Sequence, residues 1–487
     1  MIQETGMRIP QEIFRFFSNP GGHSLILRGN AGAGKTTLAL QVIEDLAAIE
    51  KSYYFPTRVS DESLFLQFPW LKEKMDLFLQ AKGDKAMGPG VKWQPREGLC
   101  KLKGLTPSRP SSGKDRMSVS IGKDVGEIES LYKMVESGLP ERTLLVIDSL
   151  DALAERNGIP CVKLITAIQK DLVEEYGANV LCILESPEQL LDYLGDGVVR
   201  IGMTEHNGRR MREIEILKLR GCEIQQPKYL CTLKGGRMQS FGYWSERSLV
   251  SEQTWRPVAD YGDRLSTGIK DLDGMILGGF EPGAVVLIEL GSGVPISVAG
   301  AIENSMVSNF ASLNRGVVWV PLRKASAENV RARVTTKLPK ERFDKCVRVG
   351  EHSSGMADSQ FIIPLEGSDA SSDFKWQTLA YHLQGTDAPS LSLMGFDTLE
   401  SIYGNQVIEQ LIDHLAMVRR NRSVFVGLVS PSSASTQRLI DLATVRLRVE
   451  RVVGTVVLCG EEPYTELNAM QLKEAEFGGG ISLTPIV

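Results

Sequence analysis

Short runs of consecutive apolar residues alternate with segments of helical periodicity along the first half of the chain. Such runs are typical of strands buried on both faces of a parallel sheet, because a strand with one solvated face would alternate. The order of elements therefore predicts an α/β domain with a mostly parallel sheet. The pattern predicts strands at 24–27, 52–55, 143–148 and 179–184, helices at 37–46, 125–137 and 162–176, and a closing meander of strands at 197–201, 212–218 and 229–233.

The strand at 24–27 leads into a complete G-x-x-x-x-G-K-[ST] motif, the P-loop, and the helix at 37–46 leaves it. Its glycines let the backbone wrap a phosphate, so that N–H groups and the helix N-terminus point at the anion. The lysine bridges the β- and γ-phosphate oxygens, and the threonine offers a hydroxyl to Mg²⁺. The flanking strand and helix disfavour the alternative, a glycine-rich turn with an accidental lysine. We expect ATP to be bound by Gly29, Asn30, Ala31, Gly32, Ala33, Gly34, Lys35, Thr36 and Thr37.

The strand at 143–148 ends in Asp148 after four apolar residues. This is typical of a Walker B strand, which delivers one carboxylate to the Mg²⁺ shell. Many buried strands end in an aspartate, so the pattern gains its weight from the intact P-loop upstream. We expect Thr36 and Asp148 to be metal ligands, and Lys35 and Asp148 to be catalytic.

Length and composition narrow the class of protein. The 487 residues suffice for two or three domains, and the net charge of −5 gives no general attraction to nucleic acid. The seven cysteines include no C-x-x-C pair, which favours free thiols in a reducing compartment over a disulfide framework or a zinc site. No apolar run approaches the roughly 20 residues that span a membrane. We expect a cytoplasmic protein without membrane contact.

Residues 81–124 differ in composition from the rest of the chain. They hold eleven Gly or Pro among 44 positions, and ten Lys or Arg against four Asp or Glu. Such a segment cannot bury enough apolar surface to order itself alone, so we expect a basic surface insertion in the first domain. Its charge permits a contact with nucleic acid or an acidic partner, and a merely solvated loop is the alternative.

Four segments of the first half resemble the KaiC-like branch of the RecA superfamily. They are the P-loop, the Asp148 strand, the segment 196–199, and the run 212–221, which is similar to the family's late-strand K-M-R-G signature. In the family such domains form rings, in which this lysine and arginine reach the neighbouring subunit's nucleotide. The resemblance implies a homo-oligomer with Lys218 as a sensor in trans and Arg220 as an arginine finger. The alternative for both residues is an exposed strand end with ordinary charges.

A second copy of the domain is expected at 263–487, after a first domain at 1–240 and a linker at 241–262. Residues 265–283 look like the family's S-T-G-I-x-x-L-D and G-G domain opening, and a strand at 284–289 follows. In the next loop Pro295 stands at the second P-loop glycine and Ile296 at the lysine. Proline removes an N–H donor and isoleucine cannot compensate phosphate charge, so this nucleotide site is degenerate. A strand at 390–397 is expected to keep a Walker B-like Asp397.

The fold class is therefore two tandem RecA-like P-loop domains, the second with a degenerate site. Residues 54–60 and 454–464 resemble most the gas-vesicle operon regulators among KaiC-like proteins. Typical KaiC-like domains carry a Glu-Glu pair after the second strand, and here Thr57-Arg58 stands instead. An arginine cannot act as a base at neutral pH. The acids that could replace the pair are Asp61, Glu62 and Glu185, and we expect slow ATP turnover.

Three functions compete at this stage. The first is an ATP-dependent regulator, a slow switch acting on a protein partner such as a transcription regulator. The second is a recombination or repair ATPase on DNA, supported only by the basic insertion. The third is a nucleotide-stabilised assembly module whose second domain is a docking platform. Steep salt dependence of DNA binding would favour the second function.

Overall fold

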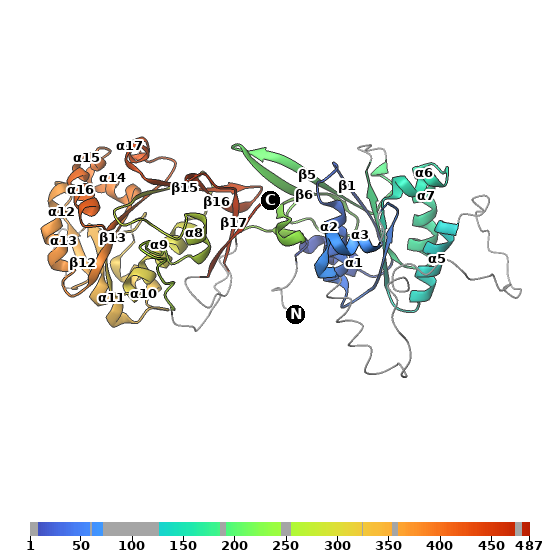
Figure 1. The fold of residues 1–487 in the computed structure, drawn as a ribbon, viewed down its shortest axis with the longest axis horizontal. Helices are drawn as coiled ribbons and strands as arrows, with labels where there is room; N and C mark the ends of the chain where they lie inside the picture. Colours follow the sequence, from blue (N-terminus) through green and yellow to red (C-terminus); the bar gives the residue numbers. More distant parts are fainter. Residues whose placement is uncertain are drawn as a thin grey trace, which may run out of the picture. The chain divides into compact units, whose positions relative to one another are not determined.

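The computed structural model describes residues 8–58, 61–71, 126–185, 191–244, 255–323, 325–352, 359–472 and 480–487. The chain divides into two compact units, each with its own sheet (Figure 1). The first unit comprises Met1–Asn207, Met211–Gly242 and Val487, and the second comprises Gly208–Arg210 and Tyr243–Ile486.

The predicted strands of the first unit are present. Those at 143–148 and 179–184 have the predicted bounds, whereas the one expected at 197–201 extends to His206 and the one expected at 212–218 begins at Arg209. The helix expected at 162–176 is an α-helix that continues as a π-helical segment. The described elements are α1 (Gln11–Ser18), β1 (Ser24–Gly29), α2 (Lys35–Leu46), β2 (Lys51–Pro56), α3 (Asp61–Gln67), α5 (Gly126–Gly138), β3 (Thr143–Asp148), α6 (Leu150–Arg156), α7 (Cys161–Ile168), η2 (Gln169–Glu175), β4 (Asn179–Leu184), β5 (Gly197–His206), β6 (Arg209–Leu219), β7 (Lys228–Thr232), η4 (Lys234–Gly236) and β8 (Gln239–Phe241).

The sheet of the first unit has the strand order β2-β3-β4-β1-β5-β6-β7-β8. The first five strands are parallel, and β7 and β8 continue the sheet antiparallel to their neighbours. A tight turn at Asn207 and Gly208 reverses the chain between β5 and β6, so β6 runs against β1. Helices cover both faces, and β1 is buried on both, because Leu25 and Leu27 belong to one hydrophobic cluster and Ile26 to the other.

The second unit has helices on both sides of a sheet of its own. Its described elements are α8 (Lys270–Met275), β9 (Val285–Leu290), α9 (Ile296–Ser312), β10 (Arg315–Val320), α10 (Ala327–Val334), α11 (Lys340–Cys346), β11 (Val347–His352), β12 (Ile362–Leu365), α12 (Ala370–Asp373), α13 (Trp376–His382), β13 (Asp387–Gly395), α14 (Phe396–Tyr403), α15 (Val407–Gln410), α16 (Ile412–Arg420), β14 (Val424–Val429), α17 (Thr436–Leu442), β15 (Val445–Val452), β16 (Thr455–Glu462), β17 (Asn468–Leu472) and β18 (Ile481–Pro485).

The second sheet repeats the first strand for strand. Its order is β12-β11-β10-β13-β14-β9-β15-β16-β17-β18. Without β11 and β12, this is the first sheet's order with β9 in the place of β1, and it is parallel from β12 to β15. Two clusters of buried side chains again lie on the two faces, with Val286 in one and Leu287 in the other. The chain therefore has the predicted fold, two tandem RecA-like P-loop domains.

Two sequence-based expectations concern regions outside these sheets. The basic insertion expected at 81–124 lies outside the described residues. In the part of the chain that the structure covers, no helix combines the length and the apolar character needed to cross a membrane.

Candidate functional site

The P-loop of the first unit connects the carboxyl end of β1 to the start of α2. Gly34 precedes the helix with a φ of 107°, a backbone conformation that suits glycine. Lys35 is the first helical residue, and its side chain is buried. Its ammonium group donates to the carbonyl of Gly29 over 2.8 Å and to that of Asn30 over 3.1 Å. The Lys35 side chain therefore folds back over the P-loop, where its charge is expected to contact the bound phosphates.

An arginine that the sequence analysis gave no individual role braces the same loop. Arg212 on β6 is buried, and its Nη1 donates to the carbonyls of Gly32 and Ala33 over 2.9 Å each. Its Nε donates to the carbonyl of Val487 over 2.8 Å. These bonds fix the loop carbonyls on the side away from a bound phosphate, which leaves the loop N–H groups to face it. The signal in the sequence is a charged residue in alternation with Ile214 and Ile216, which lie in the core on the same face of the strand.

The Asp148 carboxylate meets the P-loop directly. Asp148 ends β3, and its Oδ2 accepts a hydrogen bond of 2.7 Å from the Thr36 hydroxyl. The two predicted metal ligands, 112 positions apart, therefore lie together. A hydroxyl beside a carboxylate at the start of a P-loop helix suits a hard divalent cation that also contacts phosphate.

Tyr54 is a second donor to the same carboxylate oxygen. Its hydroxyl lies 2.8 Å from Asp148 Oδ2, and the side chain is 5% exposed. Tyr54 pairs with Val146 in the sheet, so it shares a face with Asp148 two residues further on. Burial and the Asp148 carboxylate raise the pKa of Tyr54, so its phenol stays protonated and donates. The sequence analysis missed this role, because Tyr54 reads there as one apolar residue of a buried strand.

The position of the usual Glu-Glu pair holds Thr57 and Arg58 at the same carboxyl edge. Thr57 is buried, and its hydroxyl donates to the Asp148 carbonyl over 3.0 Å. The guanidinium of Arg58 lies 3.7 Å from the carboxylate of Glu185, which follows β4. Of the three acids considered as replacements, Glu185 thus reaches this edge in an ion pair. Asp61 and Glu62 begin α3, and their side chains lie outside the described part of the chain.

Lys218 and Arg220 lie at the opposite edge of the sheet from the P-loop of their own unit. Arg212 contacts the P-loop, and Lys218 lies six residues further along β6, about 20 Å away for an extended strand. Lys218 donates to the carbonyl of Gly195 over 2.6 Å. Arg220 makes an ion pair of 3.0 Å with Asp196, which directly precedes β5. Neither side chain can reach the phosphate site of its own unit.

The corresponding loop of the second unit cannot cradle a phosphate. Pro295 precedes α9 with a φ of −60°, where the first unit has the left-handed Gly34. Ile296 stands at the lysine position with 47% of its surface exposed. Ser297 corresponds to Thr36, and its hydroxyl accepts a hydrogen bond of 3.0 Å from the Trp244 indole. The hydroxyl that corresponds to the expected metal ligand Thr36 is therefore engaged in a hydrogen bond with a side chain of the same unit.

The sequence-based assignment of Asp397 as a Walker B-like residue on a strand is wrong. β13 ends at Gly395, and Asp397 lies in the first turn of α14, where its carboxylate accepts from the Ser430 N–H over 3.3 Å. The pairing registers of the two sheets instead place Gly395 at the position of Asp148. The equivalent pairs are Leu27–Ile183 with Ile288–Leu428, and Ile147–Cys182 with Met394–Gly427.

Gly395 leaves no room for a carboxylate. A Cβ atom there would overlap the backbone of Leu322 and lie 2.6 Å from the carbonyl carbon of Pro321. The backbone of Pro321 and Leu322, which follow β10, approaches too closely for any side chain. The sequence misplaced the Walker B position by two residues because an aspartate near the end of an apolar run is the only local signal.

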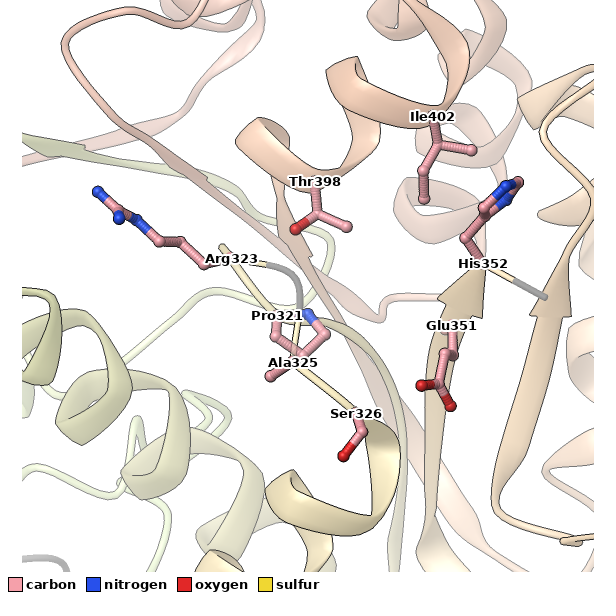
Figure 2. Close-up of a pocket in the computed structure, with 9 residues that line it drawn as sticks. Pro321, Arg323, Ala325, Ser326, Glu351, His352, Thr398 and Ile402 are labelled. Atoms are coloured by element: carbon pink, nitrogen blue, oxygen red, sulfur yellow. The ribbon is translucent and has the colours of Figure 1, made fainter.

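The second unit has a different cavity at the carboxyl ends of β10 and β11. Its volume is about 250 Å³ (Figure 2). Figure 2 shows Thr398 and Ile402 of α14 on one side and Glu351 and His352 of β11 on the other, while Arg323 extends away from Glu351. With an acid on its wall and no P-loop beneath it, the cavity does not replace the lost phosphate site.

Comparisons with known proteins match both halves of the chain. The family described as GvpD gas vesicle protein, P-loop domain, matches residues 13–217, and the one described as GvpD basic region 2 matches residues 254–422. Protein GvpD2 of Halobacterium salinarum is 26% identical over 503 residues, which cover 98% of this chain and 96% of that protein. The circadian clock oscillator protein KaiC of a Nostoc species is 24% identical over 308 residues, which cover 60% of this chain and 53% of that protein.

Repairing the loop of the second unit is not expected to create a second nucleotide site. The double substitution Pro295→Gly and Ile296→Lys restores the second glycine and the lysine of the motif, yet Leu290 stands at its first glycine, the Walker B position stays a glycine and the Trp244 indole still donates to the Ser297 hydroxyl. Titration calorimetry should give one bound nucleotide per chain before and after the change. Two nucleotides per repaired chain would contradict the assignment of Gly395.

Proposed function

We propose that this chain, a KaiC-like P-loop protein of the RecA type close to the GvpD branch, is an ATP-dependent regulator with one working nucleotide site per chain. The observation that carries the proposal is the contrast between the two units. The first joins Lys35, Thr36 and Asp148 at one edge. The second has Ile296 and Gly395 in place of the lysine and the aspartate, and its Ser297 hydroxyl is bonded to the Trp244 indole. A protein that keeps one site and dismantles the other suits a switch in which one unit senses nucleotide and the other transmits its state.

In the working site the P-loop N–H groups and Lys35 bind the β- and γ-phosphates of ATP. Thr36 and Asp148 would hold Mg²⁺, which compensates phosphate charge when bound. Arg212 fixes the loop from behind, and Tyr54 orients the Asp148 carboxylate. ATP is hydrolysed only slowly, because Glu185 forms an ion pair with Arg58 and the usual Glu pair is absent.

The arginine finger of each nucleotide site is supplied by a second copy of the chain. Arg220 and Lys218 lie at the far edge of the sheet, so they serve a phosphate only if a neighbour presents its P-loop edge to them. This arrangement makes ATP binding and self-association one equilibrium, in which each subunit completes the next subunit's site. The second unit, which has no nucleotide to bind, is the surface offered to a protein partner such as a transcription regulator.

DNA is the weaker candidate for the regulated partner. The net charge of the chain is −5, and the basic segment at 81–124 lies outside the described residues. A strong dependence of DNA affinity on salt would revive this alternative.

Substituting Lys35→Ala should abolish ATP binding with little effect on the fold, because the hydrogen bonds of the Lys35 ammonium go to carbonyls of its own loop. Thermal unfolding with Mg-ATP measures this. A ligand that binds only the folded state stabilises it by about 2.7 kcal/mol at 100 times its dissociation constant. The wild type should show the shift, and so should the control Ile296→Ala at the equivalent position of the second unit. A full shift in Lys35→Ala would place the nucleotide elsewhere.

Substituting Tyr54→Phe should weaken the Mg²⁺ dependence of nucleotide binding. The change removes one hydroxyl that fixes Asp148, and partners of metal ligands typically contribute about 10- to 100-fold to metal affinity. We expect the Mg²⁺ concentration that gives half-maximal binding of a fluorescent ATP analogue to rise about tenfold. The control Tyr53→Phe changes the next residue of β2, which points to the other face, and should leave the titration unchanged. Equal curves for both variants would remove Tyr54 from the site.

Substituting Arg220→Ala should leave ATP affinity nearly unchanged but lower turnover and weaken ATP-dependent oligomers. Arginine fingers contribute about 10³- to 10⁵-fold to rate in related phosphoryl transfers. The decisive measurement mixes Arg220→Ala with Lys35→Ala, since the first retains ATP and the second retains the finger. Mixed assemblies should recover part of the activity that each variant lacks alone. If the variants co-assemble without recovery at any ratio, Arg220 does not act in trans.

A further inference from the structure

The guanidinium of Arg220 is anchored although 69% of the side chain is exposed. Its Nη1 donates to Asp196 Oδ1 over 3.0 Å, and its backbone N–H donates to the Asp196 carbonyl over 2.9 Å. An exposed ion pair by itself adds little stability and leaves a long side chain free to leave its partner. How well Arg220 is held therefore depends on how firmly Asp196 is fixed.

Asp196 is fixed from two other elements. Its side chain is 9% exposed, and its Oδ2 accepts from the Ser24 N–H over 3.2 Å and from the Ser24 hydroxyl over 3.1 Å. The amide of Gln169 in η2 donates to the same oxygen over 2.9 Å. One carboxylate oxygen is thus committed to the body of the unit, and the other faces Arg220. Asp196 therefore connects the start of β1 to Arg220.

The Asp196–Arg220 ion pair lies on the wall of an open groove. The groove has a volume of about 530 Å³ and is lined by His23, Gln169, Glu174 and Gly221 together with the Asp196–Arg220 pair. It lies at the amino end of β1, so it belongs to the edge opposite the P-loop. A guanidinium fixed at the mouth of a groove on an outer edge is placed for contact with another molecule.

We propose that Asp196 is a positioning residue, which holds Arg220 in the direction from which a second copy of this chain presents its nucleotide. The inference rests on the proposed function, in which Arg220 acts in trans. Asp196 touches neither nucleotide nor metal. It acts by removing the rotational freedom that Arg220 would otherwise lose when the subunits meet, since ordering a long side chain at an interface opposes association.

The test substitution is Asp196→Asn. Asparagine keeps one oxygen for Ser24 and Gln169 and presents an NH₂ group to Arg220, which has no acceptor to offer there. We expect ATP affinity to stay within about twofold of the wild type and the turnover number to fall at least about tenfold, toward that of Arg220→Ala. Glu174→Gln, which removes another carboxylate of the same groove, is the control and should turn over like the wild type.

The double variant Asp196→Asn with Arg220→Ala separates positioning from a structural role. If Asp196 acts through Arg220, the double variant turns over no more slowly than Arg220→Ala alone, whereas independent effects multiply. In mixtures, Asp196→Asn should regain activity from Lys35→Ala, as Arg220→Ala does. Multiplying effects, unchanged turnover in Asp196→Asn, or turnover above the wild type would each overturn the inference.

The proposed function fails on a different result. If Arg220→Ala itself turns over like the wild type, the role of the arginine in trans is wrong, whatever Asp196→Asn does. If Arg220→Ala fails as expected and Asp196→Asn does not, only the positioning role is wrong. Thermal unfolding of each variant without nucleotide identifies a loss that comes from misfolding, and a destabilised Asp196→Asn with additive effects counts against positioning.

Discussion

The parallel pairing of β1 with β4 on one side and β5 on the other sets where every functional side chain of the first unit lies. Parallel strands bring their carboxyl ends to one edge, so the P-loop after β1, Asp148 at the end of β3 and Glu185 after β4 meet there. The same pairing places Asp196 beside the start of β1, at the other edge. A register shift of one residue in β3 would turn Asp148 to the opposite face and away from Thr36.

Sequence reasoning recovered what depends on contiguous patterns. The P-loop, the Asp148 strand and the mostly parallel sheet of the first unit follow from short apolar runs and one motif of fixed spacing. The contacts of Tyr54, Arg212 and Asp196 were not predicted. Each of these residues bonds to a partner more than ninety positions away in the sequence, and no local sequence pattern indicates such a contact. Asp397 was misassigned for the same reason, since only strand pairing shows that Gly395 is the equivalent of Asp148.

The second unit shows how a site is lost while a fold is kept. Its sheet retains the strand order of the first, and its core is closed on both faces. The losses fall on the loop, on the Walker B position Gly395 and on the Ser297 hydroxyl, which is bonded to the Trp244 indole, and the strand pairing of β13 with β14 continues through Gly395. A phosphate cradle adds little to folding, whereas the buried strands beneath it carry most of the hydrophobic stabilisation. A duplicated domain can therefore stop binding nucleotide without losing its shape.

The opposite placement of the P-loop and of Arg220 within one sheet gives the molecule a direction. In the assembly proposed above, a contact that joins one edge of a subunit to the other edge of the next would be heterologous, which makes that assembly head-to-tail and excludes a symmetric pair. An open row of such subunits always ends in one P-loop without a donor and one arginine without a recipient. Only closure into a circle removes both ends, and the last subunit to join thus completes two sites at once.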